Sequence, residues 1–81
     1  MKIELRLYAS LARYMPVHGD RRGAHQTIEI KEGTTIGSLL ENLKVPTSEV
    51  KLIFVNGVHA ALGQVLKDGD RVGIFPPVAG G

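Results

Sequence analysis

One helical stripe of apolar residues constrains the fold of this 81-residue chain more than any other feature. Its members recur at positions i, i+3, i+4 and i+7, so they line one face of a helix of about three turns. They are Ile36, Leu39, Leu40 and Leu43. Thr34 or Thr35 is expected to cap the first turn, and Val45-Pro46 ends the pattern. A helix with a single apolar face of this length needs a sheet to cover it.

Two segments with period-two alternation predict the first strands of that sheet. Residues 3–8 carry aliphatic side chains on one face and mainly polar ones on the other, and residues 27–31 alternate in the same way. We expect these two strands to pair. The side chains expected to face the core are Ile3, Leu5, Leu7, Ile28 and Ile30. Between the strands, residues 10–15 predict a short helix that Pro16 ends, and residues 16–25 predict an exposed loop.

The second half of the chain predicts a hairpin. Residues 50–55 are rich in β-branched and aromatic side chains, which favours a central strand. Asn56-Gly57 is a preferred pair for a two-residue turn, and Val58-His59 would begin the return strand. After the hairpin, three aliphatic residues are expected to pin a short helical turn onto the core. These residues are Leu62, Val65 and Leu66.

The last predicted strand spans residues 71–75 and follows an Asp-Gly-Asp turn at residues 68–70. Val72 and Ile74 would face the core, because successive side chains of a strand point to opposite faces. Phe75 would then lie on the solvent side. A bulge or a register slip would instead turn Phe75 into the core, and the sequence leaves both placements open.

Together these segments predict an α+β fold. We expect a β-grasp (ubiquitin-like) roll, in which a mixed sheet of four or five strands carries one main helix on one face. Residues 1–77 are expected to form this single β-grasp domain, and residues 78–81 are expected to form a flexible C-terminal tail that ends in Gly-Gly.

Composition excludes several classes of function. The formal net charge is only +2 and the basic residues are spread along the chain, apart from Arg21-Arg22, so we expect no nucleic-acid binding. The chain has no cysteine, which excludes disulfides, thiolate metal sites and a cysteine nucleophile. The N-terminus lacks the pattern of a signal peptide, and no apolar run approaches the ~20 residues of a membrane span. We therefore expect a soluble, cytoplasmic protein.

The polar residues do not predict a metal or nucleotide site. His18 and His25 lie in one predicted loop, but two histidines without a third ligand seldom bind a metal. Asp68 and Asp70 are explained by a turn. The chain also lacks a P-loop and a G-x-G-x-x-G pattern, so any ATP would be used by a separate protein. No metal site and no bound cofactor are expected.

The C-terminal segment carries the strongest functional signal. Pro76 and Pro77 fix their φ angles and should direct the chain away from the sheet. The arm that follows has small side chains and can enter a narrow tunnel in another protein. We expect the carboxylate of Gly81 to be the working group. A carboxylate is a poor electrophile, but ATP can convert it to an acyl adenylate with a good leaving group.

Residues 66–81, LKDGDRVGIFPPVAGG, resemble the C-terminal motif of the MoaD-like small subunits of molybdopterin synthase, which are ubiquitin-like sulfur carriers of the MoaD/ThiS superfamily. That family typically shows a DGD-x-V turn and strand that run into F-P-P-V-x-G-G. Residues 55–57 resemble its mid-chain hairpin, and residues 34–40 resemble the opening of its main helix. The resemblance spans nearly the whole chain, although residues 15–25 are longer and more basic than is usual in the family.

The resemblance implies a carrier subunit rather than an enzyme. An E1-like adenylyltransferase would use ATP to activate Gly81, and sulfur would then replace one carboxylate oxygen to give a thiocarboxylate. The tail would insert into the large subunit of molybdopterin synthase, whose catalytic residues would transfer the sulfur in molybdenum or tungsten cofactor biosynthesis. The partner-binding residues that the resemblance implies are Phe75, Pro76, Pro77, Val78, Ala79 and Gly80.

Three alternatives remain open from the sequence. A lysine amine that attacked the adenylated Gly81 would make the chain a ubiquitin-like protein modifier. A sulfur carrier of this kind could also serve another pathway, such as thiamine biosynthesis. A β-grasp scaffold could finally be a non-covalent binding module, because fold alone does not decide function.

Overall fold

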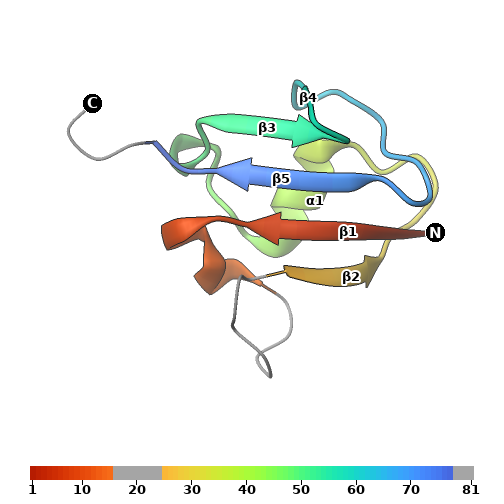
Figure 1. The fold of residues 1–81 in the computed structure, drawn as a ribbon, viewed down its shortest axis with the longest axis horizontal. Helices are drawn as coiled ribbons and strands as arrows, with labels where there is room; N and C mark the ends of the chain where they lie inside the picture. Colours follow the sequence, from red (N-terminus) through yellow and green to blue (C-terminus); the bar gives the residue numbers. More distant parts are fainter. Residues whose placement is uncertain (16–24, 78–81) are drawn as a thin grey trace.

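The computed structural model of the protein describes residues 1–15 and 25–77, which form one mixed sheet and one α-helix (Figure 1). The sheet has five strands in the order β2-β1-β5-β3-β4, and α1 crosses one of its faces. With η for a 3-10 helix, the elements are β1 (Lys2–Leu7), η1 (Ala9–Tyr14), β2 (His25–Glu29), α1 (Ile36–Leu43), η3 (Thr47–Glu49), β3 (Leu52–Val55), β4 (Val58–His59) and β5 (Arg71–Phe75). This architecture confirms the predicted α+β, β-grasp roll.

Strand β5 lies at the centre of the sheet, between β1 from the start of the chain and β3 from its second half. It runs parallel to β1, with Leu5 opposite Val72, and antiparallel to β3, with Ile53 opposite Ile74. Strand β2 adds antiparallel to the other side of β1, which confirms the predicted pairing of the first two strands. The two-residue β4 pairs with the remaining side of β3. Strand β3, which was predicted to be a central strand, is therefore paired on both sides but lies next to the edge strand β4. The strand at the centre of the sheet is β5.

The sheet face that turns toward α1 is apolar. Alternation along β1, β3 and β5 buries one side chain in two, as was predicted for β1 and β5. The buried side chains of these strands are Ile3, Leu5, Leu7, Ile53, Val55, Val72 and Ile74. On the other side of β1, Ile28 of β2 and the following Ile30 are only half-buried. The core of the domain thus lies between the three inner strands and α1.

Helix α1 begins with a capping box between Thr35 and Ser38. The Ser38 N–H donates to Thr35 Oγ1 at 3.1 Å, and the Thr35 N–H donates to Ser38 Oγ at 2.9 Å. These bonds satisfy backbone donors that have no partner within the helix. The predicted stripe faces the sheet, and its fully buried members are Ile36, Leu39 and Leu40. The helix ends where Lys44 adopts a positive φ of 63°.

The predicted helical turn at residues 62–66 is wrong. Leu62 and Val65 are 42% and 52% exposed, so only Leu66 of the three aliphatic residues enters the core. The carbonyl of Leu62 instead accepts a hydrogen bond from the backbone N–H of Gly37 at 2.8 Å. That N–H lies in the first turn of α1 and lacks an acceptor within the helix. Residues 62–66 therefore form a loop. Its backbone carbonyls accept hydrogen bonds from the first turn of α1, and two of its three aliphatic side chains stay out of the core.

The boundaries in the first half of the chain shift by small amounts. The short helix predicted at residues 10–15 is the 3-10 helix η1. Strand β2 begins at His25, two residues before the predicted start, so His25 belongs to the sheet rather than to the predicted loop. The rest of that loop, residues 16–24, lies outside the described residues.

A buried carboxylate connects the two predicted turns of the second half. Asp70 is 9% exposed. Its Oδ1 accepts from Asn56 Nδ2 at 2.9 Å, and its Oδ2 accepts from the backbone N–H of Lys67 at 2.8 Å. Asn56 has the positive φ of 53° that the tight hairpin turn requires, and its Oδ1 accepts from the N–H of Arg71 at 2.9 Å. This network fixes the start of β5 against the β3–β4 hairpin.

Replacing this carboxylate tests the network. Asp70→Ala is expected to lower the free energy of unfolding by about 1–3 kcal/mol, because the Asn56 amide and the Lys67 N–H lose their acceptors. Glu32 is exposed, so Glu32→Ala is a matched control, with an expected change within about 0.5 kcal/mol. Urea titration followed by circular dichroism measures both. Equal stability of the two variants would contradict the assigned role of Asp70.

Candidate functional site

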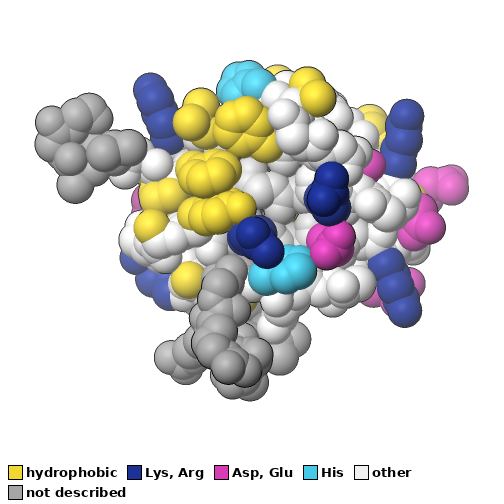
Figure 2. Space-filling view, viewed as in Figure 1, with side chains coloured by type: hydrophobic (Ala, Val, Ile, Leu, Met, Phe, Trp, Pro, Cys, Tyr) yellow, Lys and Arg dark blue, Asp and Glu magenta, His cyan; other side chains and the backbone are white. Residues whose placement is uncertain are grey.

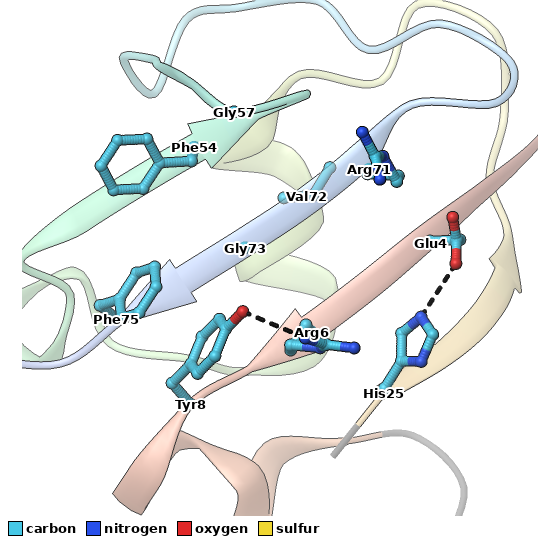
Figure 3. Close-up of a pocket in the computed structure, with 10 residues that line it drawn as sticks. All are labelled: Glu4, Arg6, Tyr8, His25, Phe54, Gly57, Arg71, Val72, Gly73 and Phe75. Atoms are coloured by element: carbon cyan, nitrogen blue, oxygen red, sulfur yellow. Dashed lines mark hydrogen bonds and ion pairs between the residues drawn. The ribbon is translucent and has the colours of Figure 1, made fainter. Parts of the chain in front are cut away.

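The sheet face that α1 leaves uncovered, which we call the outer face, carries aromatic and charged side chains (Figure 3). Alternate residues of the strands point away from the core and meet on this face. They include Glu4, Arg6, Tyr8, His25, Phe54, Arg71 and Phe75, with Gly73 among them. The surface between these residues is hollowed into an open depression of about 380 Å³, which we call the outer-face depression.

Three rings, those of Tyr8, Phe54 and Phe75, form an aromatic cluster where β5 leaves the sheet. Phe75 stacks on Tyr8 with ring centroids 4.0 Å apart and an interplanar angle of 7°. Phe54 meets Phe75 edge-on, with centroids 5.8 Å apart and an angle of 89°. Phe75 therefore lies on the outer face, which decides between the two placements that the sequence left open. Figure 2 shows hydrophobic side chains gathered on this part of the surface.

The pairing of β1 with β5 positions the stacked rings. The N–H of Tyr8 donates to the carbonyl of Ile74 at 3.0 Å, which sets Tyr8 beside Phe75. Gly73 precedes Phe75 by two residues and so lies on the same face of β5. A Cβ on Gly73 would come within 3.4 Å of Tyr8 Cε2. The ring of Tyr8 therefore lies close to bare backbone, and Gly73 forms the floor of the outer-face depression.

Charged side chains occupy the rest of the outer face. Glu4 Oε1 lies 3.0 Å from His25 Nε2. Arg6 Nη1 lies 3.5 Å from the hydroxyl of Tyr8, and the guanidinium carbon of Arg6 lies 5.8 Å from the Tyr8 ring centroid. Neither Arg6 nor Arg71 forms an ion pair with any residue that the structure describes. Among the described residues that line the outer-face depression, two are arginines and one is a carboxylate, and that carboxylate already has a partner.

A second polar cluster, away from the outer face, is structural. Arg13 Nη2 of η1 lies 2.7 Å from Glu49 Oε1 of η3, and the Tyr14 hydroxyl donates to Glu49 Oε2 at 3.1 Å. The hydrogen bond to Tyr14, with the nearby Tyr14 and Glu49 charges, raises the pKa of the Arg13 guanidinium. Arginine is protonated at neutral pH in any case. The cluster therefore ties η1 to η3.

The structure describes only part of the predicted partner-binding segment. Phe75 ends β5, Pro76 is half-buried and Pro77 is exposed, so the backbone leaves the sheet beside the aromatic cluster. The other predicted residues lie outside the described part of the chain. These are Val78, Ala79, Gly80 and the predicted reactive residue Gly81. The division into a domain of residues 1–77 and a tail of residues 78–81 stays a prediction.

The partners of Phe75 on the outer face were not predicted. Alternation placed Tyr8 and Arg6 on the outward side of β1, but it could not bring them beside β5. That contact depends on a parallel pairing of strands from opposite ends of the chain. Gly73 did carry a usable signal, because an isolated glycine inside a strand often marks the close approach of another group.

The described residues contain neither a cluster of metal ligands nor a membrane-spanning helix. Within residues 1–15 and 25–77, no group of three or more histidine, aspartate or glutamate side chains is arranged to hold a metal ion. His25 pairs with Glu4, and His18 lies outside these ranges. No helix in the same ranges has the length and apolar character needed to cross a bilayer.

Comparisons with known proteins place this geometry in context. A model of the Mut7-C ubiquitin family matches residues 1–80. A search of curated proteins finds no match. Among solved structures, the chain is similar to a Pyrococcus furiosus protein assigned as molybdopterin converting factor, subunit 1. The two share 28% identity with a TM-score of 0.69, over 95% of this chain and 98% of that chain.

Two further structures show the same fold. The small archaeal modifier protein 1 of H. volcanii is 25% identical with a TM-score of 0.68, over 95% of this chain and 98% of that chain. A complex of subunits 1 and 2 of the molybdopterin-converting factor from Helicobacter pylori contains a chain that is 24% identical with a TM-score of 0.58, over 100% of both chains. These likenesses confirm the ubiquitin-like, MoaD-like fold that the C-terminal motif implied.

The outward position of Phe75 predicts unequal effects of two neighbouring substitutions. Phe75→Ala is expected to lower the free energy of unfolding by about 1–2 kcal/mol, because it removes a half-buried stacked ring. Ile74→Ala is expected to lower it by about 2–5 kcal/mol, because Ile74 is 0% exposed and its loss leaves a cavity. Urea denaturation of both variants provides the comparison. A larger loss for Phe75→Ala would argue that its ring belongs to the core.

Proposed function

The chain belongs to the Mut7-C ubiquitin family, and we propose that it is a ubiquitin-like sulfur carrier whose Gly81 carboxylate becomes a thiocarboxylate. The similar structures support this proposal, because one is assigned as a subunit of molybdopterin converting factor and another is a small archaeal modifier. In this role the chain is a carrier on which other proteins act, and not itself an enzyme.

The placement of Phe75 is the observation that carries the proposal. A side chain of this size could be buried in the core, but it lies on the outer face at the last residue of β5. Pro76 and Pro77 follow it directly, and the predicted reactive end lies four residues farther on. A protein that binds this end would also contact the aromatic cluster, which lies where the chain leaves β5. Partly exposed aromatic surface beside a reactive group is typical of a docking site.

The proposed chemistry uses the main-chain carboxylate. This group is an anion at neutral pH, since its ordinary pKa is about 3.5, and it resists nucleophiles. Attack of a carboxylate oxygen on the α-phosphate of ATP forms the acyl adenylate and releases pyrophosphate. Hydrosulfide then adds to the acyl carbon and AMP leaves, so that sulfur replaces one oxygen. The chain has no cysteine, so the sulfur is carried on the main chain.

Two partners complete the proposed cycle. An E1-like adenylyltransferase supplies the ATP site and the activation step. The large subunit of molybdopterin synthase then accepts the tail, and its catalytic residues transfer the sulfur to a pyranopterin precursor in molybdenum or tungsten cofactor biosynthesis. The H. pylori structure, a complex of subunits 1 and 2 of a molybdopterin-converting factor, supports the pairing with a second subunit.

Intact-mass spectrometry tests the thiocarboxylate directly. Incubation with ATP, sulfide and the cognate E1-like enzyme is expected to increase the mass by the difference between one sulfur and one oxygen, because AMP leaves as sulfur enters. A chain that lacks Gly81 is the control. It is expected to keep the same circular dichroism spectrum and an unchanged mass. An unaltered wild-type mass, with an enzyme that activates a related carrier, would refute the proposal.

Protein modification is the second candidate, favoured by the likeness to the H. volcanii modifier. A lysine amine of a target would attack the adenylated Gly81 and form an isopeptide bond with loss of AMP. Epitope-tagged chain expressed in cells is then expected to yield covalent conjugates of higher mass, which are lost when Gly81 is deleted. Digestion with a protease that cleaves between Ala79 and Gly80 would leave a Gly-Gly remnant on each modified lysine, and peptide mass spectrometry would identify it. Thiocarboxylate without conjugates would favour the carrier role alone.

A further inference from the structure

We propose that the outer-face depression receives an acidic side chain of the protein that activates the tail, and that Arg6 and Arg71 recognise it. The inference rests on the proposed function, because it assigns a chemistry to the surface of the activating partner. It concerns the folded domain rather than the reactive end, so it can fail while the proposed function stands.

The charges of the outer face favour an acidic partner. Arg6 lies opposite Gly73 across the β1–β5 pair, and Arg71 lies opposite Glu4. The two guanidinium groups therefore rise on neighbouring strands beside a residue that has no side chain (Figure 3). The Glu4 carboxylate is 3.0 Å from His25, and neither arginine has an ion pair among the described residues. An incoming carboxylate would thus meet two available cations.

The shape of the surface fits one side chain rather than a flat contact. The depression has a volume of about 380 Å³, and Gly73 leaves backbone as its floor. The Tyr8 ring forms an apolar wall on which the methylene groups of a glutamate or aspartate can pack. Among the described residues, Arg6 makes one hydrogen-bonding contact, to the Tyr8 hydroxyl at 3.5 Å, which is long for a hydrogen bond. A bidentate arginine–carboxylate pair is stronger and would replace it at little loss.

The depression extends to Phe75, the last residue of β5. Arg71 and Phe75 begin and end the same five-residue strand, so they are about 13 Å apart along it. A partner that covers the aromatic cluster reaches both arginines without any change in the domain. Figure 2 shows basic side chains beside the hydrophobic ones on this face. A nucleic acid would need a longer basic stripe than two arginines provide, so an acidic protein surface is the occupant that we assign.

Charge reversal with a matched control tests the assignment. The readout is ATP–pyrophosphate exchange by the cognate E1-like enzyme at saturating ATP, with the full-length chain varied. The double variant Arg6→Glu/Arg71→Glu is expected to raise KM for the chain at least about tenfold at low salt, with kcat within about twofold. The wild-type KM is expected to rise with ionic strength, and that dependence is expected to be lost in the double variant.

The control is Lys31→Glu/Lys67→Glu, which changes the net charge equally at exposed positions outside the depression. Its KM is expected to stay within about twofold of the wild type. Gly73→Ala tests the shape of the floor independently. The added Cβ has an ordinary contact of 3.4 Å with Tyr8, so folding is expected to be preserved while KM rises about threefold or more. Gly63→Ala, where a Cβ meets nothing within 4 Å, is its control.

The outcomes separate the two proposals. No exchange with the wild-type chain would overturn the proposed function. Normal exchange, with the same KM for the wild type and for Arg6→Glu/Arg71→Glu, would overturn this inference alone. An equal rise in KM for both charge-reversed variants would also overturn it, because the effect would then be one of net charge. Binding of a single-stranded oligonucleotide that depends on the two arginines would assign the depression to a different partner and overturn the inference as well.

Discussion

The parallel pairing of β1 with β5 is the constraint on which both faces of this sheet depend. On the inner face it sets Leu5 opposite Val72, at the centre of the core. On the outer face it sets Arg6 opposite Gly73 and aligns Tyr8 with Phe75 through a hydrogen bond to Ile74. One set of backbone bonds thus builds the core under α1 and the surface that α1 leaves open.

The central strand is held at both of its ends. At its start, Asp70 and Asn56 bind each other and the backbone around them, so β5 enters the sheet in a fixed register. At its end, the stacked rings of Tyr8 and Phe75 fix the last residue before Pro76. The point at which the chain leaves β5 is therefore fixed by contacts within the domain itself.

Local pattern was sufficient to predict most of the elements. The stripe of α1, the inward side chains of β1 and β5 and the Asn56-Gly57 turn each follow from periodicity or turn chemistry that a short segment contains. The loop at residues 62–66 was wrongly predicted as a helical turn. Its carbonyl at Leu62 accepts a hydrogen bond from the distant Gly37, and such a contact between distant segments leaves no pattern in the local sequence. The outer face was only half predictable. Alternation predicts that Arg6 and Tyr8 point outward, but it leaves two placements open for Phe75, and the contact between these residues requires the pairing of distant strands.

The pairing of β1 with β5 also determines how much of the chain must be synthesised before the domain can fold. Strand β1 begins at residue 2, and its partner β5 is complete only at residue 75. A nascent chain therefore holds β1 with one side unpaired until almost all of the domain has left the ribosome, and closing so long a loop is slow. A prematurely terminated product lacks the central strand, and with it both the core and the surface beside the tail. Under the proposed function, such fragments would lack the surface that we assign to docking and would not compete with the folded domain for an activating enzyme.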